Sequence, residues 1–203
     1  MEVRLTKFAV AAMAVALCGY AGAQTPQLVS ANAQLTQNVD TKNVTEGQVV
    51  TAKLTSNVKA AGQSELPKGT TLIGKVTQVE KASGSAPTKL TLTFDKAKLP
   101  NGQTVPVKAT LLSAYPAGQN DYYVQTGLSG SLVQQQSQVV PANTQVDQTA
   151  GGPLGNVALH GDVSSDVSGV FTSTSKEINL RRGTQFQLAI APEGGAQGAA
   201  NGQ

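Results

Sequence analysis

The sequence predicts an all-β fold, a small barrel or sandwich of about eight short strands with Gly-led turns. One observation is a phrase that occurs four times: an apolar residue, two turn-prone residues, Gly, then Gln or Thr, one further residue and an apolar residue. A second is that alternating or β-rich runs follow these phrases, which is typical of strands. A third is that no window after the N-terminal segment carries a clear helical stripe with caps.

The four copies of the phrase predict turns. They are Val44–Val50, Leu66–Leu72, Leu99–Val105 and Leu180–Phe186. In each copy a polar or Pro-containing pair precedes a Gly that is free to adopt positive φ, which is turn chemistry. We therefore assign a structural role as turn glycines to Gly47, Gly69, Gly102 and Gly183.

Strands are expected where β-branched and apolar residues alternate with polar ones. Gly74 in the second of these runs suggests a bulge or a close backbone approach, and Pro106 in the fourth favours an edge or a bulge. The expected strands are 49–54, 71–79, 90–94, 104–112, 122–124, 169–174, 176–180 and 185–190. The one exception to the strand pattern is 129–138, where a helix is the alternative.

Three segments flank or interrupt this pattern. Residues 24–38 are rich in Gln, Ala, Thr and Asn without clear periodicity and are expected to be flexible. Residues 134–169 contain few aliphatic side chains and are predicted to form a long polar loop. The tail 192–203 is almost wholly Gly, Ala, Asn and Gln and is expected to be disordered. The β domain then spans 39–191.

The first 23 residues have the pattern of a signal peptide. Arg4 and Lys7 lie in a charged start, an uncharged apolar stretch runs from Phe8 to Leu17, and Ala21-Gly22-Ala23 is a typical cleavage site. The apolar stretch is shorter than the roughly 20 residues of a membrane span, so no transmembrane helix is expected after its removal. Cys18 raises the alternative of a lipoprotein signal, although Leu17 is larger than the residue such signals place before the cysteine.

Removal of 23 from 203 residues leaves a chain of 180 residues without cysteine. Disulfides, thiolate chemistry and Cys-ligated metals are thereby excluded. The formal net charge falls from +3 to about +2, because Arg4, Lys7 and Glu2 are removed. The charges are scattered rather than clustered, which argues against a nucleic-acid partner.

The order of these motifs resembles the C-terminal β-barrel domain of the conjugation TrbI-like family, a component of type IV secretion cores. The family pattern is a Gly-led strand, a Lys-Gly turn and strand, a strand that ends near Pro-x-Gly, a Gly-x-x-Gly stretch and a final Gly-led strand. The matching segments are Gly47–Ala52, Leu66–Gly74, Leu90–Gly102, Gly127–Gly130 and Leu180–Ile190. The resemblance covers about 145 residues and implies a related exported β domain that assembles with envelope proteins.

Groups that could support catalysis are few. His160 is the one histidine in the sequence, and Asp162, Ser164, Ser165 and Asp166 follow it. Members of a catalytic triad must meet in space, which neighbouring loop residues rarely do, and no G-x-S-x-G motif is present. One His with two Asp is a poor zinc site, and the spacing differs from that of a calcium loop. We expect a solvated polar loop, no enzyme, no metal and no cofactor.

Two groups of residues are candidates for contact with a partner. Tyr122 and Tyr123 could anchor an interface, although successive residues of a strand face opposite sides, so at least one is expected in the core. Lys68, Arg181 and Arg182 occupy equivalent positions in two copies of the turn phrase and would form a basic rim if these turns lie together.

These observations favour a non-catalytic protein of the bacterial cell envelope, periplasmic or secreted, with association with the outer membrane as an alternative. Its expected partners are envelope proteins, with weak self-association. The alternative is a secreted binding module for a polymer or a small ligand. The scarcity of acid–base and nucleophilic groups places an enzyme third.

Overall fold

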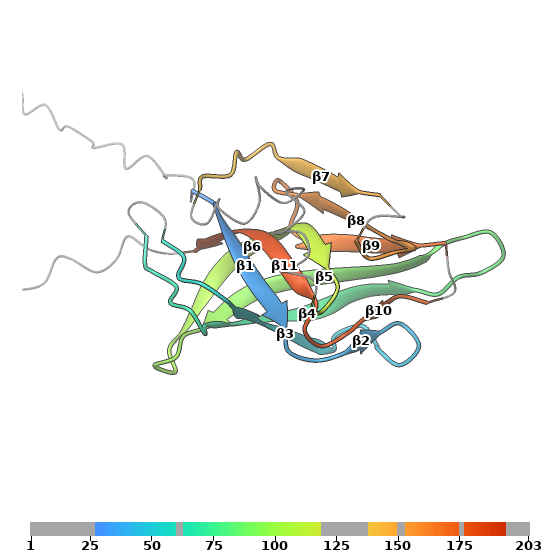
Figure 1. Cartoon of the computed structure of the whole chain (residues 1–203), viewed down its shortest axis with the longest axis horizontal. Helices are drawn as coiled ribbons and strands as arrows, with labels where there is room; N and C mark the ends of the chain where they lie inside the picture. Colours follow the sequence, from blue (N-terminus) through green and yellow to red (C-terminus); the bar gives the residue numbers. More distant parts are fainter. Residues whose placement is uncertain (1–26, 60–62, 119–137, 150–152, 175–176, 194–203) are drawn as a thin grey trace, which may run out of the picture.

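The computed structural model describes residues 27–59, 63–118, 138–149, 153–174 and 177–193, and Figure 1 shows their arrangement. The strands are β1 (Val29–Leu35), β2 (Val39–Asp40), β3 (Val49–Leu54), β4 (Thr71–Glu80), β5 (Thr88–Lys98), β6 (Thr104–Tyr115), β7 (Gln145–Gln148), β8 (Val157–Asp162), β9 (Gly169–Ser173), β10 (Asn179–Leu180) and β11 (Gln185–Pro192). No helix occurs in the described ranges. The predicted all-β class is confirmed, with eleven strands rather than about eight.

Six strands close into a barrel. Their order is β4–β3–β1–β11–β6–β5, and β5 pairs with β4 to complete the ring. Each neighbouring pair is antiparallel, for example with Ala33 opposite both Leu54 of β3 and Phe186 of β11. Closure removes the free edges that an open sheet would leave.

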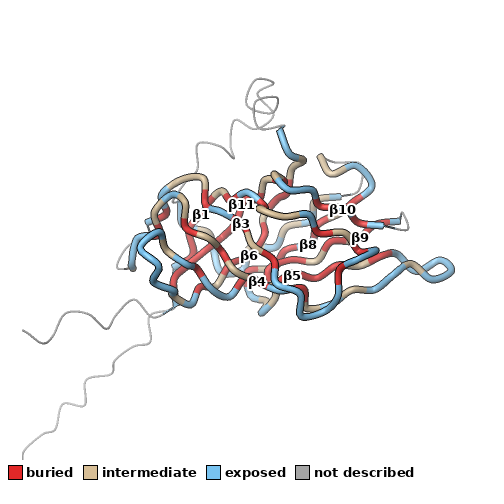
Figure 2. The backbone as a smooth tube through the Cα atoms, turned by 90° about the horizontal axis from the view of Figure 1, so that it is seen from below, coloured by how far each residue is buried: buried red, intermediate tan, exposed pale blue. Residues whose placement is uncertain are grey.

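Side chains fill the inside of the barrel. The rings of Phe94 and Phe186 lie 6.4 Å apart, and those of Phe171 and Phe186 lie 6.3 Å apart. Leu35, Leu54 and other inward-facing residues of the strands are fully buried around these rings. Figure 2 shows the buried stretches in the middle of the molecule and the exposed ones at the loops. The interior is therefore a packed core, as expected for a small barrel.

The sheet branches at β5. One edge of β5 pairs with β6 through residues 94–98 and with β9 through residues 88–92. From β9 the sheet continues through β8 to β7. These three strands lie beside the far half of β6 (Figure 1), where Gln148 both accepts a hydrogen bond from the Ala114 N–H and donates one to the Ala114 carbonyl, each at 2.9 Å.

Ser168 occupies the point at which β6 parts from β5. Its N–H donates to the Leu92 carbonyl (2.9 Å), and its carbonyl accepts from the Leu111 N–H (2.6 Å). Its hydroxyl oxygen accepts from the Phe94 N–H (2.8 Å). A buried backbone donor left without an acceptor costs about 1–3 kcal/mol, so this serine satisfies the groups that the fork would otherwise leave unpaired.

The barrel contains an internal repeat. Residues 29–39 and 48–58 are identical at five of eleven aligned positions, including the run Leu-Thr-x-Asn-Val. The pairing repeats as well: Ala33 lies opposite Phe186 as Ala52 lies opposite Leu72, and Ala31 lies opposite Leu188 as Val50 lies opposite Gly74. Two strand pairs, β1–β11 and β3–β4, are therefore related by an approximate two-fold axis between β1 and β3.

A second, smaller apolar cluster covers the outside of the barrel at β11. Leu28 and Val163 are buried there against Ala189 and Ala191. The segment around Val140 adds to this cover, because the Val140 N–H donates to the Leu28 carbonyl and the Ser30 N–H donates to the Gln138 carbonyl, each at 2.8 Å. Both faces of β11 are buried in this way, from Phe186 to Pro192.

Two predicted flexible regions differ from the structure. In the segment 24–38, predicted to be flexible, residues 29–35 form β1, which pairs with β3 and β11 in the ring. In the segment 134–169, predicted to be one long loop, β7 and β8 form an antiparallel pair that extends the sheet from β9. β1 is ordered by pairing with strands that include the distant β11, and β7 and β8 are ordered by pairing with each other and with β9, which composition did not indicate.

Smaller differences concern element ends. The strand predicted at 176–180 is limited to β10, and β11 continues to Pro192, the first residue of the predicted tail. Several predictions lie outside the described residues: the signal peptide with Cys18, the rest of the tail from residue 194, the strand 122–124 and almost all of the possible helix at 129–138.

Candidate functional site

The four turn glycines all have positive φ. The values are 82° at Gly47, 89° at Gly69, 88° at Gly102 and 92° at Gly183. Gly69 and Gly183 occupy equivalent places in the repeat. The Gly69 N–H donates to the carbonyl of Leu54 at the end of β3, and the Gly183 N–H donates to the carbonyl of Leu35 at the end of β1. Each turn thus binds the end of the strand that pairs with the strand it leads into, β3 for the turn before β4 and β1 for the turn before β11.

An asparagine holds each of these two turns. Asn57 Oδ1 accepts from the Lys68 N–H (2.8 Å), and Asn38 Oδ1 accepts from the Arg182 N–H (2.7 Å). The side chains of Lys68, Arg181 and Arg182 are exposed. Because β1 and β3 are antiparallel, the two turns, held by Asn57 and Asn38, follow opposite ends of the pair. The structure does not bring Lys68 to the two arginines, so they form no common basic rim.

The tyrosine candidates are only partly placed. Tyr122 and Tyr123 lie outside the described residues. Tyr115 lies at the end of β6, opposite Gln185, and is half-buried.

His160 differs from the prediction that it lies in a polar loop. It belongs to β8, where it stands opposite Asp147 of β7, and its Nδ1 lies 2.6 Å from Asp147 Oδ1. About half of the His160 side chain and 76% of the Asp147 side chain are exposed. Exposed polar pairs of this kind contribute little to stability, because both groups remain in contact with water.

The other polar residues of that region are separate from His160. Asp162 Oδ1 accepts from the N–H and the hydroxyl of Ser164, at 2.8 and 2.6 Å, and Asp162 Oδ2 accepts from Gln145. The hydrogen bonds from Ser164, then the one from Gln145, hold the pKa of Asp162 below its usual value. Asp162 therefore caps the turn after β8 with Oδ1, while its Oδ2 accepts from Gln145 of β7.

Ser165 and Asp166 contribute instead to a cavity of about 160 Å³ outside the β5–β6 seam. Its lining includes Phe94, Asp95, Lys108 and Glu193. Three carboxylates and one ammonium surround an opening that is too small for most ligands of drug size. In the described part of the chain, no three His, Cys, Asp or Glu side chains gather closely enough to hold a metal ion.

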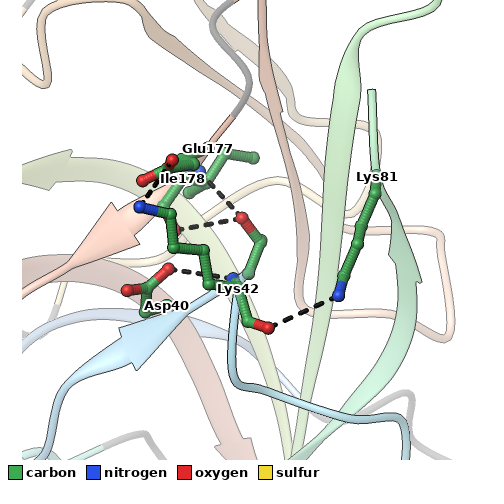
Figure 3. Close-up of polar contacts among 6 residues, drawn as sticks. Asp40, Lys42, Lys81, Glu177 and Ile178 are labelled. Atoms are coloured by element: carbon green, nitrogen blue, oxygen red, sulfur yellow. Dashed lines mark hydrogen bonds and ion pairs between the residues drawn. The ribbon is translucent and has the colours of Figure 1, made fainter. Parts of the chain in front are cut away.

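A polar cluster joins three segments that are distant in the sequence (Figure 3). Lys42 Nζ lies 2.7 Å from Glu177 Oε1, and Lys81 Nζ donates to the Lys42 carbonyl at 3.4 Å. Beside this ion pair, the buried Thr41 makes two hydrogen bonds to the backbone of Ile178: the Thr41 N–H donates to the Ile178 carbonyl, and the Thr41 hydroxyl oxygen accepts from the Ile178 N–H. The hydrogen bond to Glu177, then its charge, raises the pKa of Lys42. The cluster ties the loop after β2 to the segment before β10 and to the β4–β5 hairpin.

Neither Thr41 nor Ser168 was singled out from the sequence. Isolated Thr and Ser residues give no signal, because their partners, Ile178 and Phe94, are 137 and 74 residues away. The repeated Leu-Thr-x-Asn-Val run could have indicated the Asn38 and Asn57 caps.

Comparison with known proteins gives little further detail. No family model matches the chain. No curated protein matches it either. Among solved structures, ComB10 of the Com type IV secretion system of Helicobacter pylori is similar at 12% sequence identity and a TM-score of 0.40, over 81% of this chain and 86% of that chain. None of the described segments forms a helix with the length and apolarity of a membrane span.

Proposed function

We propose that this chain is a non-catalytic exported envelope protein whose β domain binds other envelope proteins and is related to the barrel components of type IV secretion systems. The observation that supports this most is the packed interior of the barrel. Three phenylalanine rings and the surrounding leucines fill it, so a partner has to be bound by the outer surface and the loops. The sequence resemblance in the order of the turn motifs favours an envelope partner.

The polar groups that come together on the outside also suit this role. Lys42 with Glu177 is an exposed ion pair between two loop segments, and His160 with Asp147 is an exposed hydrogen-bonded pair between β8 and β7. Such pairs fix surface geometry and contribute to partner choice more than to stability. The alternative function, a secreted module for a polymer or small ligand, is favoured by the cavity at the β5–β6 seam.

Light scattering after size exclusion separates the two functions. The exported protein should be monomeric or weakly associated when purified alone, and should migrate in a much larger species when the envelope is gently solubilised. A monomer under both conditions, together with stabilisation by an added polymer or small ligand, would support the alternative instead. In-cell crosslinking gives a second test. A photoreactive residue at the exposed position Lys68 can reach a neighbouring protein, whereas one at the buried position Leu66 cannot and serves as the control.

A further inference from the structure

Strand register gathers four lysines on one outer face of the barrel, and a turn adds a fifth. Lys53 on β3 lies opposite Thr71, which lies opposite Lys98 on β5. In the next row Ile73 of β4 lies opposite Lys96, and beyond it Lys75 lies opposite Val49 and Thr93. Lys68 joins the group through its turn, since the Lys53 side chain packs within 3.6 Å of the Cβ position at Gly69. We call Lys53, Lys68, Lys75, Lys96 and Lys98 the lysine face.

All five lysines are exposed, and none forms an ion pair with another described residue. The cations of Lys42 and Lys89, by contrast, are paired with Glu177 and Glu80. Between the lysines lie two apolar side chains, Val49, which is 55% exposed, and the half-buried Ile73. The face therefore combines unneutralised positive charge with a small apolar centre.

The internal repeat provides a comparison for this face. On the related side of the barrel, Ala189 and Ala191 of β11 stand where β4 has Lys75 and Thr77, and Leu28, Val140 and Val163 cover them. Among the described residues no segment covers the outside of β3–β4–β5. One half of the barrel thus presents small apolar residues that its own chain buries, and the other half presents lysines to the surroundings.

The chemistry of the face favours an extended anionic surface over a protein partner. Protein interfaces are depleted in Lys at their cores and enriched in aromatic residues and Arg, and the lysine face contains neither. Lysine ammonium groups are point charges on flexible stems, which suit a diffuse array of negative charges more than a fixed geometry. Each basic residue near an anionic bilayer contributes to binding, and apolar side chains among them enter the headgroup region.

The acidic residues near this face lie on a side of the barrel that turns away from a surface in contact with β4. Asp95, Asp166 and Glu193 surround the cavity at the β5–β6 seam, beyond Thr93. Because a closed six-stranded barrel curves strongly from strand to strand, a planar surface that touches β4 leaves this seam turned away.

We propose that the lysine face binds an anionic lipid surface, with β4 nearest to the headgroups. This goes beyond the proposed assembly role, and vesicle binding and assembly are measured separately, so that either can fail alone. The exported protein is tested by flotation with phosphatidylglycerol-containing vesicles and with pure phosphatidylcholine vesicles, at low and at high salt.

The protein is expected to bind the anionic vesicles at low salt. It should not bind the neutral vesicles, and high salt should abolish its binding to the anionic ones. The Lys75→Gln, Lys96→Gln double variant should bind about 25-fold more weakly, since each lysine near an anionic surface contributes roughly fivefold. The charge-matched control is Arg181→Gln with Arg182→Gln, at the opposite end of the β1–β3 pair, which should bind almost as well as the parent.

Thermal melts establish that both variants fold. Equal loss of vesicle binding in both variants would show that only net charge matters and would overturn the proposal. Failure of the parent protein to bind anionic vesicles would overturn it as well. Retention on soluble polyglutamate without vesicle binding would assign the face to an acidic protein instead.

Discussion

Phe94 packs on Gly74 where the β4–β5 register shifts. A Cβ at Gly74 would clash with the Thr93 carbonyl oxygen and would lie 2.7 Å from Phe94 Cδ1. Gly74→Ala should therefore destabilise the protein by about 1–3 kcal/mol, because backbone and ring must shift to admit the methyl group. Urea unfolding measures the change. Lys75→Ala, exposed at the next position, is the control and should change the free energy of unfolding by less than about 0.5 kcal/mol.

Gly69 and Gly183 test the same backbone conformation in two surroundings. Substitution of either by Val should cost more than about 1 kcal/mol, because side chains are strained at positive φ. For substitution by Ala, Gly183 should be the more sensitive site, since its Cβ would lie 2.9 Å from Ala117 Cβ, whereas that of Gly69 would lie 3.6 Å from the mobile end of Lys53. Equal losses of unfolding free energy would show that the contact with Ala117 relaxes without cost.

Asp162 gives the turn after β8 a dependence on pH. Its folded-state pKa is lowered by the hydrogen bonds from Ser164, so the stability it contributes is present above its unfolded pKa and is lost as the pH falls through the folded value. The difference in melting temperature between the parent and Asp162→Asn should thus shrink below about pH 4. A difference that grows on acidification would contradict this role.

At the scale of elements, the repeat makes a quantitative prediction. Asn38 and Asn57 make the same hydrogen bond to the backbone of equivalent turns, at 2.7 and 2.8 Å. Replacing either with Ala should therefore destabilise the protein by a similar amount, about 1 kcal/mol. The sites are at opposite ends of the β1–β3 pair, so the double variant should show the sum. Chemical denaturation of both single variants and the double variant measures this, and a strongly unequal pair would argue against equivalent caps.

The strands that could be predicted from the sequence are those with large apolar side chains facing inward. β3, β4, β6 and β11 carry Val, Leu, Ile or Phe at buried positions; each begins at the predicted residue and ends within three residues of the predicted end. β1 places the small residues Ala31 and Ala33 in the core, which give a weak pattern although the strand is central. The β7–β8 pair has a polar, largely exposed strand, β7, whose order comes from non-local bonds such as that of Gln148 to Ala114.

The candidate site was less accessible to sequence reasoning than the fold. The turn phrase located Gly69 and Gly183, but the opposite ends at which their turns lie follow from the antiparallel pairing of β1 with β3. The lysine face could not be recognised in the sequence either, because it also depends on strand pairing. Its residues come from three strands and one turn, and only the register of β3, β4 and β5 places them in adjacent rows.

At the scale of the whole molecule, β1 joins the two halves of the repeat. It pairs with β3 on one side and β11 on the other, so the barrel is continuous only with β1 in place. Deletion of residues 24–38 should therefore open the barrel, expose the edges of β3 and β11, and yield aggregated or unfolded protein. Deletion of 194–203, which lies beyond β11, is the control and should leave a folded barrel. Circular dichroism and light scattering distinguish the outcomes, and a folded monomer without 24–38 would show that β3 and β11 can close the ring without β1.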